Sequence, residues 1–296
     1  MEEMEDMSST CSVPQTSTRN LVQEIETNMM AYWAWIFSSP FSKVEDEEDF
    51  LRLSCDVPEP MCNYVFRSRF PDLEVGRRIE ETLDFFRMRN LPMSWMVGPC
   101  CRPTNIGEQL VSHGLAHPHE HESVGMTIDL MNLNENLPAA EGVTIRRVTN
   151  DSDMKDFIKP FGEGFGFPDA VTTTWGRMDS SHGFHSGLPR INYVAMVDGE
   201  PASCTTVFET PSSAGIYCVA TVPEKRRRGA ASALIVNALR EARDDGYRLG
   251  LLQAKAAGAG VYRKIGFVDQ PCKIGWYMWQ PGSEVRRGGA SSDAAP

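Results

Sequence analysis

The sequence predicts an α/β protein made of two copies of one fold, and three observations support this prediction. Amphipathic helical patterns alternate with short apolar runs typical of strands along most of the chain. The order strand, long helix, strand, short helix ending in glycine, strand occurs twice, with Gly114 and Gly266 ending the two short helices. Between the two copies, residues 132–142 (NLNENLPAAEG) have the Asn, Pro and Gly content of a linker.

The expected domains therefore occupy residues 19–135 and 143–281. A length of 296 residues suits two domains better than one. Residues 1–18 are polar, acidic and rich in Ser and Thr, so we expect them to be disordered, and we expect residues 282–296 to form a flexible tail.

Within each half the pattern of apolar residues places the elements. In the first half we expect helices at residues 21–37, 73–90 and 104–114, another short helix after the charge run 45–49, and strands at 61–70, 93–97 and 124–131. In the second half we expect helices at residues 151–161, 168–178, 226–246 and 259–266, and strands at 143–148, 214–222, 247–254 and 273–280. Residues 191–209 predict a hairpin that turns at Asp198-Gly199.

Composition and charge exclude several classes of function. The chain is 41% hydrophobic and 23% charged, as in ordinary globular proteins, and no apolar run reaches the length of a membrane span. A net charge of −11 and a pI near 5.1 argue against general binding to nucleic acid or to an anionic membrane. The acidic start MEEMEDMSST is not a secretory signal. We expect a cytoplasmic protein.

The cysteines and histidines do not form a recognisable metal motif. None of the eight cysteines belongs to a CxxC pair, and Cys204 and Cys218 lie in apolar strand-like runs, so we expect reduced cysteines. The segment HGLAHPHEHES, residues 113–123, is rich in possible ligands, but it contains Pro118 and lacks a paired Cys motif. A polar loop is favoured over a zinc site there, and we expect no metal.

The most distinctive stretch is VPEKRRRGAASAL, from Val222 to Leu234, where an acidic protein concentrates four positive charges. A strand is expected to end near Val222 and a helix to begin near Gly229. The first amides of a helix have no partner inside the helix, and the helix dipole adds partial positive charge, so a phosphate binds well there. Gly229 lets the phosphate approach the backbone closely. A solvated basic helix start is the alternative interpretation of this stretch alone.

A second motif lies downstream, and together the two resemble the GNAT superfamily of acyl-CoA-dependent N-acyltransferases. The pyrophosphate loop of that family, Arg/Gln-x-x-Gly-x-Gly/Ala, is matched by Arg226, Gly229 and Ala231. The C-terminal signature of a Tyr before a Gly-Phe pair is matched by Tyr262, Gly266 and Phe267. The resemblance covers residues 143–280, and the first half looks like a degenerate copy. It implies two GNAT-like domains, each with a mixed, mostly antiparallel central sheet flanked by helices.

The resemblance also implies a site for acetyl-CoA as co-substrate. Main-chain groups of Val219, Ala220 and Val222 would contact the pantetheine arm. The pyrophosphate would be held by the loop that follows, which comprises Arg226, Arg227, Arg228, Gly229, Ala230 and Ala231. Tyr262 would protonate the departing thiolate, because a Tyr hydroxyl is protonated at neutral pH.

Two family positions differ in this sequence. Lys255 lies near the place of a common Asn, and Gly215 lies where many members carry a Glu that acts as general base. A base must therefore come from elsewhere, or bulk water must accept the proton. Glu209, which follows the preceding strand, is our candidate, and the alternatives are Glu163, His182 and His185.

The first half lacks both motifs. Asp72 and Glu74 lie where its pyrophosphate loop would be, and Leu110 occupies the place of the Tyr. We expect this half not to bind acyl-CoA and to form one wall of the acceptor cleft. Phe161, Phe165 and Phe167 predict a partly apolar lip to that cleft, with an ordinary turn containing core aromatics as the equal alternative.

The function predicted from the sequence is transfer of an acetyl group from acetyl-CoA to a primary amine of a small molecule or peptide, by direct attack. The alternative is an acyl-CoA-binding sensor or scaffold without turnover. Transfer to a peptide or an aminoacyl-tRNA is a third hypothesis, which only the arginines support. We expect no nucleic acid or membrane partner, and a monomer or a homodimer.

Overall fold

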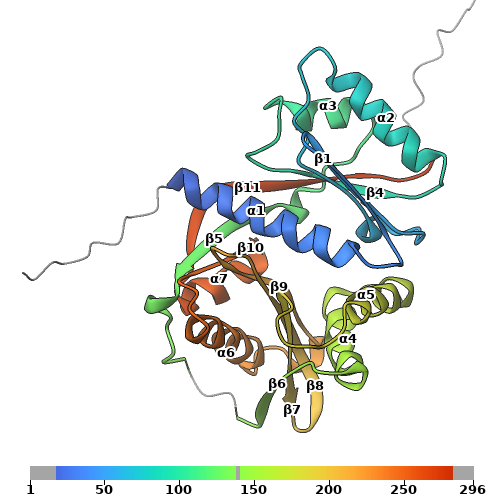
Figure 1. The fold of residues 1–296 in the computed structure, drawn as a ribbon. Helices are drawn as coiled ribbons and strands as arrows, with labels where there is room; N and C mark the ends of the chain where they lie inside the picture. Colours follow the sequence, from blue (N-terminus) through green and yellow to red (C-terminus); the bar gives the residue numbers. More distant parts are fainter. Residues whose placement is uncertain (1–17, 138–140, 283–296) are drawn as a thin grey trace, which may run out of the picture.

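The computed structural model describes residues 18–137 and 141–282, and it contains one continuous mixed sheet (Figure 1). The expectation of a separate central sheet in each half is therefore wrong. Within the described residues the sheet has eleven strands in the order β1-β2-β3-β4-β11-β5-β10-β9-β8-β7-β6. Neighbouring strands are antiparallel except for the pairs β3–β4 and β9–β10, so the predicted mostly antiparallel character is confirmed.

The strands have the following bounds: β1 (Lys43–Glu47), β2 (Phe50–Ser54), β3 (Asn63–Phe66), β4 (Met93–Val97), β5 (Ser123–Asp129), β6 (Val143–Arg147), β7 (Arg190–Val197), β8 (Glu200–Glu209), β9 (Ala214–Thr221), β10 (Leu249–Lys255) and β11 (Val268–Trp279). The described α-helices are α1 (Thr18–Phe37), α2 (Val75–Arg87), α3 (Ile106–Ser112), α4 (Asp151–Phe165), α5 (Asp169–Ser181), α6 (Ala230–Asp244) and α7 (Ala256–Ile265).

Almost every element predicted from the sequence is present, and the exception is the acidic stretch near residue 45. A helix was expected after that charge run, but β1 and β2 form an antiparallel hairpin instead. Tertiary pairing decides the outcome, because β2 is buried against β3, whereas β1 exposes its charged side chains at the edge of the sheet. The predicted tails lie outside the described residues, except that Thr18 already belongs to α1 and Gly282 is described as part of a turn.

The centre of the sheet exchanges strands between the two halves of the chain. β5 comes before the linker but pairs with β10 along its whole length, from Ser123 opposite Lys255 to Asp129 opposite Leu249. β11 comes from the end of the chain but lies between β4 and β5. Each half therefore contributes its last strand to the other half. The domain ranges drawn from the sequence stay a prediction.

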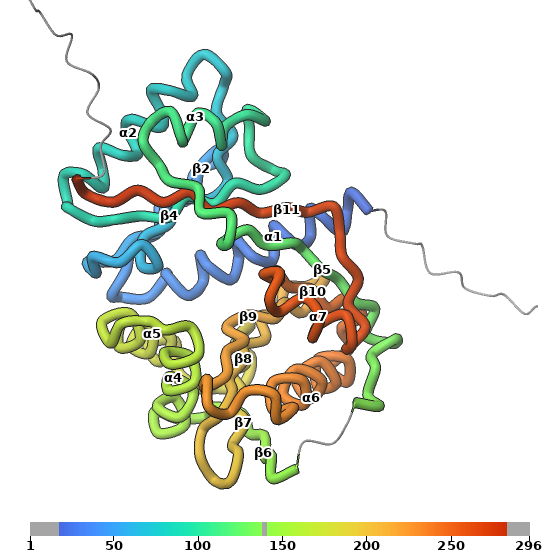
Figure 2. The backbone as a smooth tube through the Cα atoms, turned by 180° about the vertical axis from the view of Figure 1, so that it is seen from behind, coloured from blue at the N-terminus to red at the C-terminus, as the bar shows by residue number. Residues whose placement is uncertain are grey.

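Helices cover both faces of the sheet (Figures 1 and 2). α6 and α7 pack on one face of β7–β10, and α4 and α5 pack on the opposite face. α2 and α3 cover the part of the sheet formed by the first half. α1 crosses between the halves and contacts β2, β5, β9 and β11. Its buried residues Ile25, Met29, Tyr32 and Ile36 therefore belong to a core shared by both halves.

Candidate active site

β9 and β10 separate part of the way along their length. They are hydrogen-bonded only where Ala214, Gly215 and Ile216 lie opposite Gly250, Leu251 and Leu252. Just beyond this point β9 bulges, because Cys218 has a positive φ of 53° and the register with β8 shifts between Cys204 and Thr206. The edge of β9 that follows the bulge therefore faces an opening in the sheet.

The N-terminus of α6 lies at the end of this opening. Gly229 caps the helix with φ +79°, a conformation that favours glycine, and the first turn of α6 contains no acidic residue. The amides of Ala230 and Ala231 cannot be paired inside α6, since no helical turn precedes them. These groups fit an anion such as a pyrophosphate.

The basic run contributes less free charge than its sequence suggests. Lys225 Nζ pairs with Glu200 at 2.7 Å, and an Arg228 guanidinium nitrogen pairs with Asp198 at 2.9 Å. Arg226 donates to the backbone oxygen of Gly164 at 2.9 Å. Among the described residues, Arg227 has no ion-pair or hydrogen-bond partner for its side chain, so its charge is available to a ligand.

Other predicted contacts for acetyl-CoA lie along the same edge. Val219 is half-buried, and Ala220 and Val222 are buried in β9 and directly after it. Gly164 of α4 passes close to this strand, because a Cβ at Gly164 would lie 2.8 Å from the backbone nitrogen of Thr221. The structure thus brings Val219, Ala220, Val222 and the loop of residues 226–231 together at one end of the opening.

Tyr262 lies on α7, which follows β10 directly. Its ring meets Phe267 edge-on with centroids 6.0 Å apart. Burial raises the pKa of Tyr262 to about 12, so the hydroxyl is protonated at neutral pH. Within the described residues this hydroxyl has no hydrogen-bond partner.

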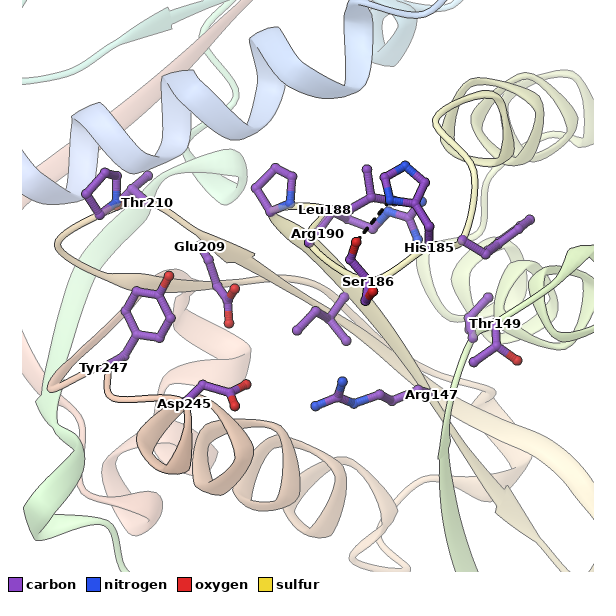
Figure 3. Close-up of a pocket in the computed structure, with 16 residues that line it drawn as sticks. Arg147, Thr149, His185, Ser186, Leu188, Arg190, Glu209, Thr210, Asp245 and Tyr247 are labelled. Atoms are coloured by element: carbon purple, nitrogen blue, oxygen red, sulfur yellow. Dashed lines mark hydrogen bonds between the residues drawn. The ribbon is translucent and has the colours of Figure 1, made fainter.

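Glu209 lies far from this opening. It pairs with Ala214 at the closed end of the β9–β10 pair. The Cys218 bulge, where the opening begins, lies four residues further along β9, or about 13 Å at the rise of a strand. Figure 3 shows Glu209 beside Arg147, Asp245 and Tyr247 in a cavity of about 610 Å³. Burial, and then the charge of Asp245, raise the pKa of Glu209. The paired part of β9 and β10 separates this cavity from the opening.

The other candidate bases are also not brought to the opening. His185 lines the same cavity as Glu209 (Figure 3). His182 stacks on Trp35 with centroids 4.0 Å apart, and Glu163 is exposed on α4.

A second cavity, of about 310 Å³, lies at the opening itself and joins the two halves of the chain. It is lined by α1, α4, α5, β9 and β10, and by β3, β4, β5 and β11. Phe161, Phe165 and Phe167 are among its walls. His121 and Gln253 also line it, and the sequence did not indicate either for this role. His121 could have been found only as one of the closely spaced histidines.

Three groups of that histidine-rich loop converge. Ligand atoms of His117, His119 and Glu122 lie within 4.8 Å of one another, and His119 Nδ1 is 2.9 Å from Glu122 Oε1. His119 is 82% exposed in its side chain. The expectation of a polar loop without a metal stays a prediction.

The cysteines are unpaired wherever the structure describes them. All seven cysteines within residues 18–137 and 141–282 are free thiols. No helix in these two ranges is long and apolar enough to span a membrane.

Comparison with known proteins gives a family for the second half and a fold for most of the chain. The profile of the GNAT acetyltransferase domain matches residues 144–268. A GCN5-related N-acetyltransferase from Kribbella flavida aligns with a TM-score of 0.67 at 16% identity, covering 88% of this chain and 96% of that one. A tandem GNAT protein from the clavulanic acid biosynthesis pathway aligns with a TM-score of 0.57 at 13% identity, covering 91% and 98%.

A further structure, a GCN5-related N-acetyltransferase from Sphaerobacter thermophilus, has a TM-score of 0.54 at 16% identity and covers 81% of this chain and 85% of that one. None of the curated proteins matches the sequence. Identities this low show a shared fold and leave substrate and mechanism open. The open β9–β10 pair, the glycine-capped α6 and the domain profile agree with one another. Residues 144–268 therefore match the GNAT acetyltransferase domain, and the chain as a whole shares the fold of the solved structures.

Proposed function

We propose that the protein is an N-acetyltransferase that transfers the acetyl group of acetyl-CoA to a primary amine. The observation that supports this best is the opening between β9 and β10, which leads to the first amides of α6, whose hydrogen-bonding groups have no partner inside the helix. An extended thiol ester with a pyrophosphate at its far end matches this arrangement in shape and charge. The amides of Ala230 and Ala231 would hold the pyrophosphate with Arg227. The stretch from Val219 to Val222 at the end of β9, where Arg226 Nε donates to Thr221 O at 3.2 Å, would hold the pantetheine arm.

The chemistry follows from groups on either side of the opening. The amine nitrogen attacks the thioester carbonyl carbon, a C–N bond forms, and the C–S bond then breaks. A backbone N–H beside the Cys218 bulge would stabilise the tetrahedral oxyanion. Tyr262 would give its proton to the departing thiolate, and the products are the N-acetylated amine and CoA.

The proton lost by the amine requires an acceptor, and Glu209 lies too far away to be that acceptor. We infer that His121 takes this role, because it lines the cavity at the opening beside Ser123 and Lys255. Burial, and then the positive charge of Lys255, lower the pKa of His121, so the imidazole is neutral at pH 7 and able to accept a proton.

The test is calorimetric titration with acetyl-CoA followed by measurement of CoA release in the presence of an amine panel. Binding with amine-dependent CoA release would support the transferase. Tight binding without turnover on any small amine or peptide would favour the sensor, and no binding at all would refute both.

A further inference from the structure

The cavity at the opening is the part of the molecule whose chemistry the family does not determine. We propose that it binds a primary amine of the size of a single amino acid, which bears an aromatic ring and a hydrogen-bond-accepting oxygen. The acetylation of this amine rests on the proposed function, whereas its binding to the cavity does not. Three properties of the cavity support it: its walls, its unpaired donors and its charge.

The walls are predominantly aromatic and come from both halves. Trp33 of α1 meets Tyr64 with ring centroids 4.6 Å apart and meets Trp175 edge-on at 5.5 Å. Trp175 in turn stacks on Phe161 at 5.2 Å, and Trp276 of β11 closes the cavity beside Tyr64. A planar ring gains both apolar burial and edge-to-face contacts in such surroundings, whereas a sugar or a short aliphatic chain gains less.

Two hydrogen-bond donors in these walls have no partner among residues 18–137 and 141–282. Trp175 is only 5% exposed, and its Nε1–H has no acceptor there. Gln253 Nε2 is buried and likewise has none. An unsatisfied buried donor is costly, and a ligand oxygen would remove that cost. By contrast, the hydroxyls of Tyr32 and Tyr217 are already used, by Cys218 Sγ at 3.1 Å and Asn28 Oδ1 at 2.6 Å.

The charge of the cavity argues against polycationic acceptors. No Asp or Glu is among the described residues that line it, and its one charged side chain is the cation Lys255. Within the described residues Lys255 has no ion-pair partner, so a ligand carboxylate could occupy that place. A polyamine or an aminoglycoside would bring several positive charges with no counter-charge to receive them.

The size restricts the ligand further. About 310 Å³ lies at the small end of the range for ligand sites, roughly 300–1,000 Å³. Such a volume holds one ring system with a short polar chain. Phe165, which is 45% exposed and stacks on Phe167 at 5.0 Å, forms the outer lip.

The experiment measures equilibrium binding to the full chain by calorimetry, with five amines of matched design. L-Phenylalanine has the ring and the oxygen, 2-phenylethylamine lacks the oxygen, and L-alanine lacks the ring, while spermidine and kanamycin are polycations. We expect L-phenylalanine to bind best, with each omission weakening the binding at least about threefold, and no binding of the polycations. Equal or tighter binding of L-alanine or of a polycation would overturn the proposal.

Two variants test whether the amines bind in the cavity at the opening. Trp175→Phe keeps a ring but removes the N–H, so we expect weaker binding of L-phenylalanine and unchanged binding of 2-phenylethylamine. Phe165→Ala should weaken both aromatic ligands, and because Phe165 is at the surface, this variant remains informative if Trp175→Phe does not fold. Phe41→Ala is the matched control, since Phe41 is 42% exposed and lies away from the cavity. Equal effects of Phe165→Ala and Phe41→Ala would contradict the assignment.

The outcomes separate this inference from the proposed function. Acetyl-CoA is titrated in a parallel experiment without amine. Failure of acetyl-CoA to bind, together with selective binding of L-phenylalanine, would refute the transferase and support the aromatic site. Amine-dependent CoA release with spermidine but not with L-phenylalanine would support the transferase and refute the aromatic site.

Discussion

The two halves of the chain build the same strand–helix junction, but one junction is closed and the other is open. In the first half, β3 and β4 are followed by further backbone bonds, from Arg102 N to Ser68 O at 2.7 Å and from Phe70 N to Arg102 O at 3.0 Å. Trp95 fills the space and donates to Ser68 Oγ at 2.7 Å. In the second half, the pairing of β9 with β10 ends at Ile216, and beyond it no strand of the described residues pairs with β9 on that side.

The helix starts differ in charge as well as in shape. Glu74 caps α2 in an ordinary right-handed conformation, and Asp72 lies two residues before it. Gly229 caps α6 in a left-handed conformation, after four basic residues. Glu74 at the start of α2 is paired with Arg77, whereas the first turn of α6 has no acidic side chain beside its amides.

The short helices show that the two halves share their architecture at the level of single hydrogen bonds. Leu115 N donates to Leu110 O at 3.1 Å, and Phe267 N donates to Tyr262 O, also at 3.1 Å. Both helices end in a glycine with positive φ. The difference at the equivalent position, Leu110 against Tyr262, is one of chemistry alone. The backbone bonds that end these two helices therefore do not depend on which side chain stands at this position.

The largest effect we predict concerns the exchange of strands. Residues 1–137 and 138–296 expressed separately should not unfold cooperatively, because β11 would lose both β4 and β5 as partners. Circular dichroism during thermal unfolding measures this, with co-expression of both pieces as the control. Cooperative unfolding of either piece alone would show that the halves are independent.

The next effect sharpens the contrast between the two helix starts. Gly229→Glu should weaken acetyl-CoA binding at least about a hundredfold, since it adds a negative charge and strains a positive φ. Calorimetry measures the affinity. Gly246→Glu is the control, because Gly246 also has positive φ but lies beyond the other end of α6. Similar losses in both variants would point to misfolding and against the phosphate site.

Tyr262→Phe tests the position at which the first half has Leu110. Loss of the general acid should lower kcat about a hundredfold, with acetyl-CoA affinity unchanged. Steady-state kinetics and calorimetry give the two values, and Tyr247→Phe at the closed end is the matched control. Full activity of Tyr262→Phe would remove Tyr262 from the mechanism.

His121 predicts a dependence on pH. Its pKa is lowered from 6.5, and the base must be neutral, so kcat/KM should fall as pH drops through a midpoint below 6.5. His121→Asn should lower kcat/KM about tenfold at pH 7, a modest loss because water can replace the base, and should abolish this acid limb. His119→Asn, in the exposed part of the same loop, serves for comparison. An unchanged pH profile in His121→Asn would assign the limb to another group.

The smallest effect distinguishes two residues of the basic run, Arg227 and Lys225. Arg227→Ala should weaken acetyl-CoA binding about two- to fivefold, since an exposed charge contributes little. Lys225→Ala should have a smaller effect, because Lys225 is already paired with Glu200. Titrations at low and high salt measure both, and only the Arg227 contribution should decrease with salt. A larger loss in Lys225→Ala would reverse this assignment.

The sequence predicted much of the fold because most of its signals are local. The apolar period of 73–90, the glycines that end α3 and α7, and the hairpin at Asp198-Gly199 all act within a few residues. The acidic residues 45–49 misled the prediction, since a charged edge strand is stable only against its neighbour β2. Glu209 was a reasonable base by sequence position, but position along a strand does not tell which end of the pair is open.

The sequence by itself therefore determined the GNAT-like domain of the second half, the order of most elements and the glycine at the start of α6, because each depends on residues adjacent in the chain. Only the tertiary structure decided the single sheet, the exchange of β5 and β11, and the aromatic cavity. Their physical reason is the same: backbone pairing and side-chain packing join segments as distant as Trp33 and Trp276, and no local pattern records which distant segment completes a strand or closes a cavity.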